Sequence, residues 1–500
     1  MAFVLALDQS TSATKALLFD DSGNCLDRES REHRQLYPRA GWVEHDAEEI
    51  WQNTLAVLRT VALRAAERNR ELLCLSVTNQ RETIVVFERR TGRPLRPAIV
   101  WQCRRGDEIC AEHRAAGRED FVHRQTGLCL DAYFSASKLQ WLVRQEPGLR
   151  TKLESGEALI GTIDTYLVYR LTGGEVFATD GSNASRTLLF DIGRLQWSED
   201  LCSLWQVPSQ ALPEVRESAA RFGETTLEGA LPTPLPICGV MGDSQASLFA
   251  QRCFEPGMAK ATFGTGSSVL LTIGAEPRLS TRGVVTTLAW VHRGRPTYAF
   301  EGIIICSAAT LTWLRDRLGV ISDLSEAQAT AAALPDNGGV YLVPAFSGLG
   351  LPHWRPDARA AIVGLSSHSE RRHVVRAGFE SISYQLRDAL EAMRGEAGVA
   401  LKRLHGDGGP TANPWLMQFT ADLTRAELAV PTMPDCSALG AAFAGLLGMG
   451  RFRTLEELSA LPRTEVVYRP SMPPDRADRL VFGWRCAVRQ TLCLSESLPA

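Results

Sequence analysis

The sequence predicts an α/β protein made of two related domains, and three observations support this prediction. Short apolar runs alternate with polar turns and amphipathic helical segments, which is the pattern of an α/β fold. A unit of strand, small-residue turn and strand stands near the start of the chain and again just past its middle. The chain has 500 residues, which is enough for about two to four domains.

The predicted elements follow one another from the N-terminus. Apolar runs with the composition of β-strands occupy residues 3–7, 16–19, 72–78, 84–87 and 98–101. Segments with apolar residues three and four apart predict helices over Ala47–Glu67 and over 138–144. The Pro-rich stretch LPTPLPIC at 231–238 is predicted to link the two halves. We therefore expect one domain over residues 1–248 and a second over residues 249–500.

The repeated unit has a chemical meaning. It reads LALDQSTSATKALLFD at 5–20 and AKATFGTGSSVLLTIG at 259–274. A hairpin turn of small hydroxyl and Gly residues presents several backbone N–H groups at one point, where they can hold a phosphate. Because such turns are common in hairpins of every kind, one alone is weak evidence. Two of them, one opening each half, predict related domains that face a nucleotide from both sides.

The composition excludes several classes of function. With 54 basic and 57 acidic residues the net charge is −3, so no basic excess favours nucleic acid as a partner. No apolar run approaches the ~20 residues of a membrane span, and the N-terminal segment lacks the basic start of a signal peptide. The twelve cysteines form no CxxC pair, which favours reduced thiols in a cytoplasmic protein over a zinc site or disulfides.

Lysine is rare in this chain, so a lysine at a special position stands out. Of the 54 basic residues, 49 are arginine and the other five are Lys15, Lys138, Lys152, Lys260 and Lys402.

A third glycine-rich stretch, LHGDGGPTANPWLMQF, lies at 404–419. Its Asp-Gly-Gly at 407–409 is predicted to end a strand, and Asn413 with Pro414 to open a helix, so that backbone can approach a ligand. The stretch has neither the GxGxxG spacing of a dinucleotide fold nor a GxxxxGK[ST] loop. A phosphate-transfer enzyme of this kind would be neither a Rossmann dehydrogenase nor a P-loop enzyme.

Two carboxylates stand at predicted strand ends before small-residue turns, Asp8 in ALDQS and Asp243 in MGDSQAS. Phosphoryl transfer to an alcohol needs a carboxylate to hold Mg²⁺ and a base to accept the hydroxyl proton. The two Asp residues together could supply both. The alternative is that each Asp only caps a turn or a helix.

Four further residues could contact a polyol. Arg81 and Glu82 are adjacent in NQRET and together offer donors and acceptors to vicinal hydroxyls, although a plain surface pair is the default interpretation. Trp101 in IVWQCRR and Tyr133 in LDAYFSASK could pack on a carbon chain, or could equally be core residues.

These segments resemble, in order from about residue 3 to about residue 490, the serial motifs of the FGGY family of carbohydrate kinases. The matching segments are ALDQSTSATKALLFD, YPRAGWVEHDAEEIW, TNQRETIVVFE, AIVWQCRR, YFSASKLQWL, TDGSNASRTLLF, GDSQASLFAQ, AFSGLGLPHW and DGGPTANPWLMQF. NQRET and IVWQCRR together are typical of the glycerol kinases within that family. The resemblance implies two ribonuclease-H-like (actin-like) domains with ATP, Mg²⁺ and substrate in a cleft between them.

The resemblance also implies a role for each matching residue. Asp243 is implied as the general base, and it shares the metal site with Asp8. The implied substrate-binding residues are Arg81, Glu82, Trp101, Tyr133, Asp243 and Ser244. The implied ATP-binding residues are Thr11, Ser12, Ala13, Lys15, Thr265, Gly266, Ala308, Thr312, Gly409 and Asn413.

The chain departs from the glycerol kinase pattern on both sides of the reaction. Ser244 stands in place of a Gln and Ser268 in place of an aromatic residue, which would suit a longer or more hydroxylated substrate. In the first turn Ser10 replaces a Gly and Lys15 an Arg, and Lys supplies a point charge without the guanidinium fork.

Two further departures concern the nucleotide and a regulator. Ala308 and Thr312 replace a Gly and a Gln beside the adenosine, which would loosen the nucleotide contacts. Pro234 stands where bacterial members bind fructose 1,6-bisphosphate through an Arg, and an apolar loop offers that anion no grip.

The sequence therefore supports an ATP-dependent kinase acting on a primary hydroxyl of glycerol. The alternative is a kinase of the same family for a four- or five-carbon polyol or ketose, such as erythritol or xylulose. A different class, actin-like proteins that bind or hydrolyse ATP without a polyol, has no reason to keep Arg81, Glu82, Tyr133 and Asp243 together. Assembly into a homo-oligomer stays open.

Overall fold

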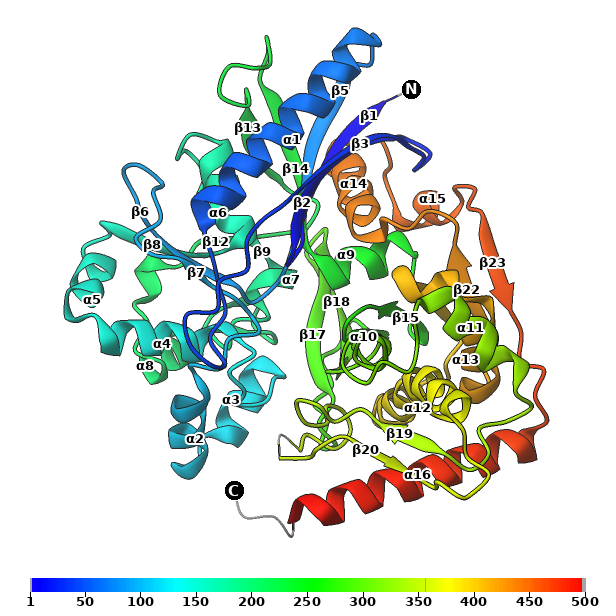
Figure 1. The fold of residues 1–500 in the computed structure, drawn as a ribbon. Helices are drawn as coiled ribbons and strands as arrows, with labels where there is room; N and C mark the ends of the chain where they lie inside the picture. Colours follow the sequence, from blue (N-terminus) through cyan, green and yellow to red (C-terminus); the bar gives the residue numbers. More distant parts are fainter. Residues whose placement is uncertain (1, 356, 497–500) are drawn as a thin grey trace.

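The first half of the chain is built on a six-stranded sheet. The computed structural model describes residues 2–355 and 357–496, and Figure 1 shows two halves, each with its own sheet. The strands of the first sheet, in spatial order, are β13 (Arg221–Thr225), β14 (Leu235–Gly242), β5 (Leu72–Asn79), β1 (Phe3–Gln9), β2 (Ala13–Asp20) and β3 (Cys25–Glu32).

The second half is built on a seven-stranded sheet that repeats the opening hairpin. In spatial order its strands are β17 (Val285–His292), β18 (Arg295–Ile304), β16 (Ser267–Gly274), β15 (Met258–Phe263), β21 (Arg403–Asp407), β22 (Leu428–Pro431) and β23 (Glu465–Tyr468). β1 pairs antiparallel with β2 and parallel with β5, and β15 pairs in the same way with β16 and β21. The predicted repeat and both of its hairpins are confirmed.

Smaller sheets lie beside these two. A four-stranded sheet in the first half has the order β4 (Glu44–His45), β7 (Ala98–Ile99), β6 (Ile84–Glu88) and β8 (Ala158–Thr162). Three two-stranded sheets are formed by β9 (Ala178–Asp180) with β12 (Glu214–Arg216), β10 (Phe190–Asp191) with β11 (Gln196–Trp197), and β19 (Tyr341–Val343) with β20 (Ala361–Val363).

Helices cover the sheets and lie between them. In the first half they are α1 (Ala47–Glu67), α2 (Asp107–Ala115), α3 (Glu119–Thr126), α4 (Ser135–Gln145), α5 (Pro147–Glu154), α6 (Ile163–Leu171), α7 (Gly181–Ala184), α8 (Glu199–Leu204) and the 3₁₀ turn Ser209–Ala211. Between the halves lies α9 (Asp243–Ala250), and in the second they are α10 (Ala309–Asp316), α11 (Leu324–Ala333), α12 (Arg371–Ala397), the 3₁₀ turn Gly409–Ala412, α13 (Pro414–Thr424), α14 (Cys436–Gly448), α15 (Leu455–Ser459) and α16 (Pro474–Glu496).

Two helices join the halves, α9 and α14, which lie next to each other near the upper centre of Figure 1. Their close approach requires glycine: a Cβ on Gly440 would lie 1.8 Å from the carbonyl oxygen of Ala246. α14 also packs on β14, where Gly239 has φ +83° and a Cβ on it would lie 2.4 Å from the backbone nitrogen of Gly445. This packing places the start of α9, with Asp243, between the two sheets.

Most predicted elements of the first hundred residues form, and α1 has the predicted bounds. Its Asp46 cap accepts a hydrogen bond from the Glu48 N–H at 2.9 Å, which fixes the start of the helix. The strand predicted over 98–101 is shorter, Ala98–Ile99. The linker predicted at 231–238 is wrong, because its second half begins strand β14, which pairs with β5 inside the first sheet. The domain boundary after residue 248 stays a prediction.

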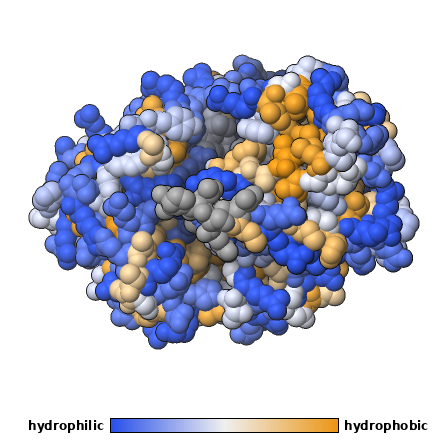
Figure 2. Space-filling view, turned by 60° about the horizontal axis from the view of Figure 1, so that its bottom comes forward, coloured by the Kyte–Doolittle hydropathy of each residue, from blue (hydrophilic) through white to orange (hydrophobic). Residues whose placement is uncertain are grey.

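Within residues 2–355 and 357–496, no helix is long and apolar enough to span a bilayer. The face shown in Figure 2 is mostly hydrophilic, with apolar residues gathered in groups toward its right side. Exposed large apolar side chains include Phe482, Leu365 and Val466. Homo-oligomerisation stays a prediction.

Candidate active site

Four buried charged residues form a closed cluster between the two halves, which we call the four-charge cluster: Arg81, Glu82, Arg186 and Glu301. Arg81 Nη2 lies 2.6 Å from Glu301 Oε1, and Arg186 Nη1 lies 2.6 Å from Glu301 Oε2. Arg186 Nε donates to Glu82 Oε1 at 2.7 Å, and Arg81 Nε lies 3.9 Å from the same oxygen. The surface pair that was the default interpretation of Arg81 and Glu82 is therefore wrong.

Three segments of the chain supply this cluster. Arg81 and Glu82 lie in the tight turn between β5 and β6, where Glu82 has φ +59°. Arg186 follows α7, and Glu301 lies on β18 of the second sheet, 220 residues from Arg81. The pair between Arg81 and Glu301 thus crosses from one half of the molecule to the other.

The charges of this cluster compensate one another. Burial alone would raise the pKa of the Glu301 carboxyl, but the two guanidinium groups outweigh burial and lower it to about 2. Two carboxylates face two guanidinium groups, so the net charge is zero and the site suits an uncharged, hydroxyl-rich ligand. Nη1 and Nη2 of Arg186 make no hydrogen bond in the described part of the chain, so the short contact of Nη1 with Glu301 is ionic.

Asp243 is the first residue of α9, directly after β14. Its Oδ1 lies 3.3 Å from Arg81 Nε, which attaches it to the four-charge cluster, and its side chain is 36% exposed. Desolvation raises the pKa of the Asp243 carboxyl, while the positive charges of Arg81 and Lys260 oppose that rise. A carboxylate beside a polyol-type cluster, partly open to solvent, has the position that a general base needs.

Ser244 and Ser268 adjoin this base. Ser244 Oγ donates to Ser268 Oγ at 3.3 Å, and Ser268 Oγ donates to Glu301 Oε1 at 3.1 Å. The two positions that depart from the family pattern are thus in contact with each other and with the four-charge cluster.

Trp101 and Tyr133 lie next to each other. Their ring centroids are 5.2 Å apart. The Trp101 indole N–H donates to Thr11 Oγ1 at 3.0 Å, which connects the predicted substrate side to the first hairpin turn. Burial, followed by the Glu82 charge, raises the pKa of Tyr133 well above its usual range, so its hydroxyl is a neutral donor.

The first hairpin turn joins β1 to β2 and is held from several sides. Ser10 N donates to Ala13 O at 2.9 Å, and His33 Nε2 lies 2.9 Å from Thr11 O. The Ser12 residue at its tip is exposed. This arrangement leaves the turn open to a ligand while fixing its base.

Asp8 and Lys15 face each other across the same hairpin. Lys15 Nζ lies 3.6 Å from Asp8 Oδ2 and 3.7 Å from Asp435 Oδ1. Burial raises the pKa of Asp8, Lys15 opposes the rise, and Asp435 adds to it. Lys260, on strand β15, and Asp8 both act on the pKa of the Asp243 carboxyl, so we group Lys260 with Asp8, Lys15 and Asp435 as the carboxylate–lysine group.

The second hairpin turn, between β15 and β16, gathers the remaining predicted nucleotide residues. Ser307 N donates to the carbonyl of Thr265 at 2.8 Å, and Ala308 N to that of Gly264 at 3.0 Å. A Cβ on Gly266 would lie 2.6 Å from Ile304 O, so the turn has room only for glycine there. Ala308 precedes α10, and Thr312 is exposed on its second turn.

The third glycine-rich turn closes on this second one. Gly408 has φ +94°, and a Cβ on it would lie 2.0 Å from the carbonyl of Phe263. Gly409 is exposed with no atom near its Cβ position, and Asn413 caps α13 by accepting from Leu416 N at 3.0 Å. The predicted strand end and helix start at this turn are confirmed.

Sequence reasoning missed three residues of this site. Glu301 and Arg186 complete the four-charge cluster. A single Glu in a strand carries no local signal, whereas Arg186 lies in the matching segment TDGSNASRTLLF, which could have pointed to it. Lys260 is fully buried on β15, where its Nζ donates to Thr262 Oγ1 at 2.8 Å. The rarity of lysine was the signal that could have pointed to it.

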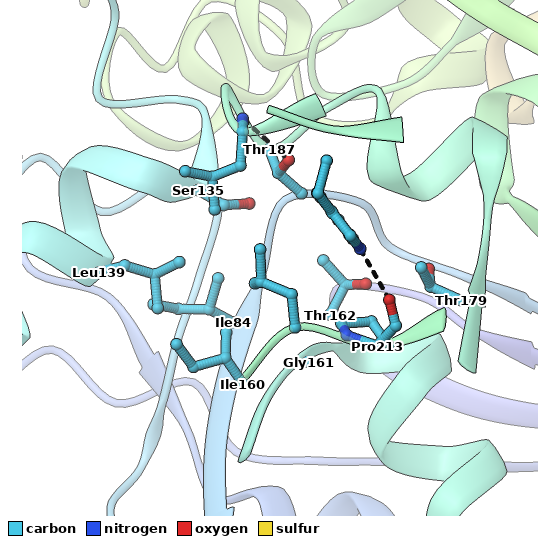
Figure 3. Close-up of a pocket in the computed structure, with 12 residues that line it drawn as sticks. Ile84, Ser135, Leu139, Ile160, Gly161, Thr162, Thr179, Thr187 and Pro213 are labelled. Atoms are coloured by element: carbon cyan, nitrogen blue, oxygen red, sulfur yellow. Dashed lines mark hydrogen bonds between the residues drawn. The ribbon is translucent and has the colours of Figure 1, made fainter. Parts of the chain in front are cut away.

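A small cavity lies apart from these groups. Figure 3 shows its lining residues, with Ser135 and Thr187 at the top, Leu139, Ile84 and Ile160 toward the left and Pro213 toward the right; Ser135 Oγ also donates to the carbonyl of Glu82. Its lining is almost entirely apolar, so it supports the back of the four-charge cluster rather than chemistry.

The comparisons with known proteins cover nearly the whole chain. The N-terminal domain model of the FGGY family of carbohydrate kinases matches residues 3–250, and its C-terminal domain model matches residues 259–449. The chain belongs to the FGGY family of carbohydrate kinases. It is 45% identical over 494 residues to glycerol kinase 1 of Thermotoga maritima, covering 98% of this chain and 99% of that protein.

Two further relatives agree with this assignment. The glycerol kinase of Shewanella baltica is 45% identical over 489 residues, covering 98% of this chain and 99% of that protein. The structure of Plasmodium falciparum glycerol kinase with ADP has a TM-score of 0.92 at 35% identity and covers 98% of each chain. The predicted family, the two-domain actin-like fold, the class of ATP-dependent carbohydrate kinase and the cofactors ATP and Mg²⁺ are confirmed.

The donor set fits Mg²⁺ held together with nucleotide phosphates. No group of three or more His, Cys, Asp or Glu side chains within residues 2–355 and 357–496 could hold a metal by itself. Mg²⁺ in kinases typically takes one or two carboxylates, with phosphate and water oxygens as the remaining ligands. Asp8, with its partly compensated carboxylate, and Asp243 are the residues present for that role.

Proposed function

We propose that this enzyme transfers the γ-phosphoryl group of ATP to a primary hydroxyl of glycerol, giving glycerol 3-phosphate and ADP. One observation carries the assignment: the Asp243 carboxylate is joined by Arg81 to a neutral, buried cluster with donors and acceptors for hydroxyl groups. The 45% identity to glycerol kinases over nearly the full chain supports the same substrate.

In this proposal Arg81 and Glu82 orient the substrate hydroxyls, with Trp101 and Tyr133 against the carbon chain. Asp243 accepts the proton of the attacking hydroxyl at its carboxylate, while Arg81 Nε, 3.3 Å away, fixes the orientation of that carboxylate. Since Glu301 binds the outer edge of the Arg81 guanidinium, the base and the substrate donors hold one geometry.

The nucleotide side of the proposal uses the three glycine-rich or small-residue turns. Thr11, Ser12, Ala13 and Lys15 would hold phosphate at the first turn. Thr265 and Gly266 would hold phosphate at the second turn. The residues around the adenosine would be Ala308, Thr312, Gly409 and Asn413. When bound, Mg²⁺ neutralises charge on the phosphates, and Asp8 and Asp243 would hold it.

A second substrate class has its own supporting observation. The hydrogen-bonded pair of Ser244 and Ser268 replaces bulk with hydroxyl groups beside Asp243. This favours a four- or five-carbon polyol or ketose, such as erythritol or xylulose, as an alternative or additional substrate. A cytoplasmic location is also proposed, supported by buried free thiols such as Cys103 and Cys110.

The test is ADP release by the purified enzyme with Mg²⁺ and ATP, measured with and without glycerol and with each longer polyol. The proposal expects release that depends on the polyol and a phosphorylated product detected by mass spectrometry. ATP hydrolysis that is indifferent to every polyol would refute it.

A further inference from the structure

The two serines beside the base form a hydrogen-bond chain with a defined direction. Ser244 lies in the first turn of α9, next to Asp243, and Ser268 lies on β16. Their Oγ atoms are 3.3 Å apart, and Ser268 Oγ continues to Glu301 Oε1 at 3.1 Å. Both serines are only half-buried, so a ligand at Asp243 can reach them.

Glu301 sets that direction. It lies fully buried between Arg81 and Arg186, each with a nitrogen 2.6 Å from one of its oxygens, and therefore stays ionised. An ionised carboxylate only accepts hydrogen bonds. Ser268 must give its single proton to Glu301, so it meets Ser244 with a lone pair and Ser244 gives its own proton to Ser268.

The hydrogen-bond chain of the two serines therefore offers only lone pairs, and no proton, to an incoming ligand group. Each hydroxyl has one proton and two lone pairs, and both protons are already committed to the sequence Ser244 to Ser268 to Glu301. A substrate hydroxyl can donate to either free lone pair. A ketone carbonyl has no proton to donate, and placing it there would leave acceptors facing acceptors, which is costly away from water.

The position of the two serines suits a substrate with a longer carbon chain than glycerol. Ser268 and Arg81 bind the same oxygen of Glu301, and Ser244 adjoins the base. A substrate with its reacting hydroxyl at Asp243 and others at Arg81 and Glu82 has its next carbon close to the two serines. An anionic substrate is disfavoured there, because the four-charge cluster has no excess positive charge and the acceptor behind Ser268 is anionic.

We propose that Ser244 and Ser268 form a subsite that takes an additional hydroxyl of a polyol longer than glycerol and discriminates against a carbonyl at that position. This rests on the proposed function, and it narrows the alternative substrate class from polyols and ketoses to polyols.

The experiment compares kcat/KM for glycerol, erythritol, threitol and erythrulose, which differ in chain length and in one carbonyl. It uses the wild-type enzyme and the variants Ser268→Ala and Ser244→Ala. The matched control is Ser267→Ala, because Ser267 precedes Ser268 on the same strand but its Oγ donates to Ser307 Oγ at 2.7 Å. The thermal midpoint and binding of an ATP analogue show whether each variant is folded.

The wild-type enzyme is expected to prefer at least one of the two tetritols over erythrulose by about tenfold, the effect of an unsatisfied buried acceptor. Ser268→Ala and Ser244→Ala should each lower the ratio of tetritol to glycerol about fivefold to tenfold, whereas Ser267→Ala should leave that ratio within about twofold. Because both serines are tested, one poorly folded variant leaves the other decisive.

Three results would overturn the subsite. They are no turnover of either tetritol by an enzyme that phosphorylates glycerol, an equal or better rate with erythrulose, and an unchanged ratio in the folded Ser268→Ala or Ser244→Ala variant. A wild-type enzyme that phosphorylates neither glycerol nor any longer polyol would instead refute the proposed function, so the two failures can be told apart.

Discussion

The four-charge cluster and the carboxylate–lysine group differ in how completely their charges are paired. In the first, every carboxylate lies within 2.7 Å of a guanidinium nitrogen, and all four side chains are buried. In the second, the two ion pairs of Lys15 are 3.6 and 3.7 Å long, and Lys260 has one hydrogen bond to a hydroxyl. The charges of the four-charge cluster are thus paired before any ligand binds (the closed side), whereas those of the carboxylate–lysine group are only loosely paired (the open side).

This difference matches what each side is proposed to bind. A neutral polyol offers hydroxyls and no charge, so a compensated cluster can orient it without leaving a charge unpaired. Mg²⁺ and ATP bring large charges of both signs, so residues that bind them must keep charge available. Asp243 contacts Arg81 of the first group and feels Lys260 of the second, so it lies where the two sides meet.

The largest expected effect is at that meeting point. Asp243→Asn keeps the shape but cannot accept a proton, and general-base catalysis contributes ~10²–10⁴-fold to the rate. We expect kcat to fall by about that factor while ATP binding, followed by calorimetry, changes little. A variant that keeps more than about a tenth of the wild-type kcat would show that Asp243 is not the base.

Glu301→Gln tests the closed side. It leaves Arg81 and Arg186 with an uncompensated buried charge, and breaking a buried pair in this way typically costs about 3–5 kcal/mol of stability. We expect a clearly lower free energy of unfolding in denaturant and a higher KM for the polyol, with the KM for ATP nearly unchanged. Equal effects on both KM values would mean that the two sides are not separate.

Lys260→Met tests the open side. Its buried ammonium donates to Thr262 Oγ1, and the charge of the buried Asp407 opposes the lowering of its pKa by burial, so removing it should also cost some stability, which the free energy of unfolding measures. Loss of one charge or donor directed at a transferring group typically lowers kcat by up to 10²–10³-fold, and we expect about tenfold to a hundredfold here, in kcat/KM for ATP.

Lys138→Met is the matched control for that variant. Lys138 is also fully buried, but its Nζ donates to the carbonyls of Tyr133 and Phe134 at 2.8 and 3.1 Å. Its removal should lower the thermal midpoint and raise the KM for the polyol through Tyr133, without a specific effect on ATP. The same kinetic pattern in both variants would argue against a phosphate role for Lys260.

Local sequence patterns predicted the parts of this site that are local in the chain. Both hairpin turns, α1, and the position of Asp243 at a strand end follow from residues close together in sequence. Glu301 could not be found in this way, because its partner Arg81 is 220 positions away and only the packing of the two halves brings them together. Family resemblance supplied roles for single positions but no partner for either guanidinium.

The wrong linker has a similar cause. Turn signals in LPTPLPIC are real up to residue 234, but Leu235 and the residues after it form strand β14. This strand pairs with β13, which directly precedes it in the chain, and with β5, which is remote in sequence. Pro236 is tolerated because it is the second residue of β14, near the strand end, where one missing donor matters little.

The pH dependence should report on the same meeting point, with a smaller effect. Burial raises the pKa of Asp243 above the ordinary 3.8, and the base must be ionised to work. kcat/KM should therefore fall, as the pH is lowered, at a higher pH than an ordinary Asp would give. Since Lys260 opposes that rise, Lys260→Met should move this acid limb upward, whereas Lys138→Met should leave it in place.

The smallest expected effect is an unchanged rate in the presence of fructose 1,6-bisphosphate. This experiment tests whether anions bind only at the carboxylate–lysine group. The loop around Pro234 is exposed and carries no Lys or Arg between residues 229 and 236, so it has no group to hold a bisphosphate. Fructose 1,6-bisphosphate at millimolar concentration, with free Mg²⁺ held constant, should leave the rate unchanged. If it inhibits, competition with ATP would place the anion at the carboxylate–lysine group, and inhibition that ATP cannot relieve would reveal a second anion site and contradict the prediction.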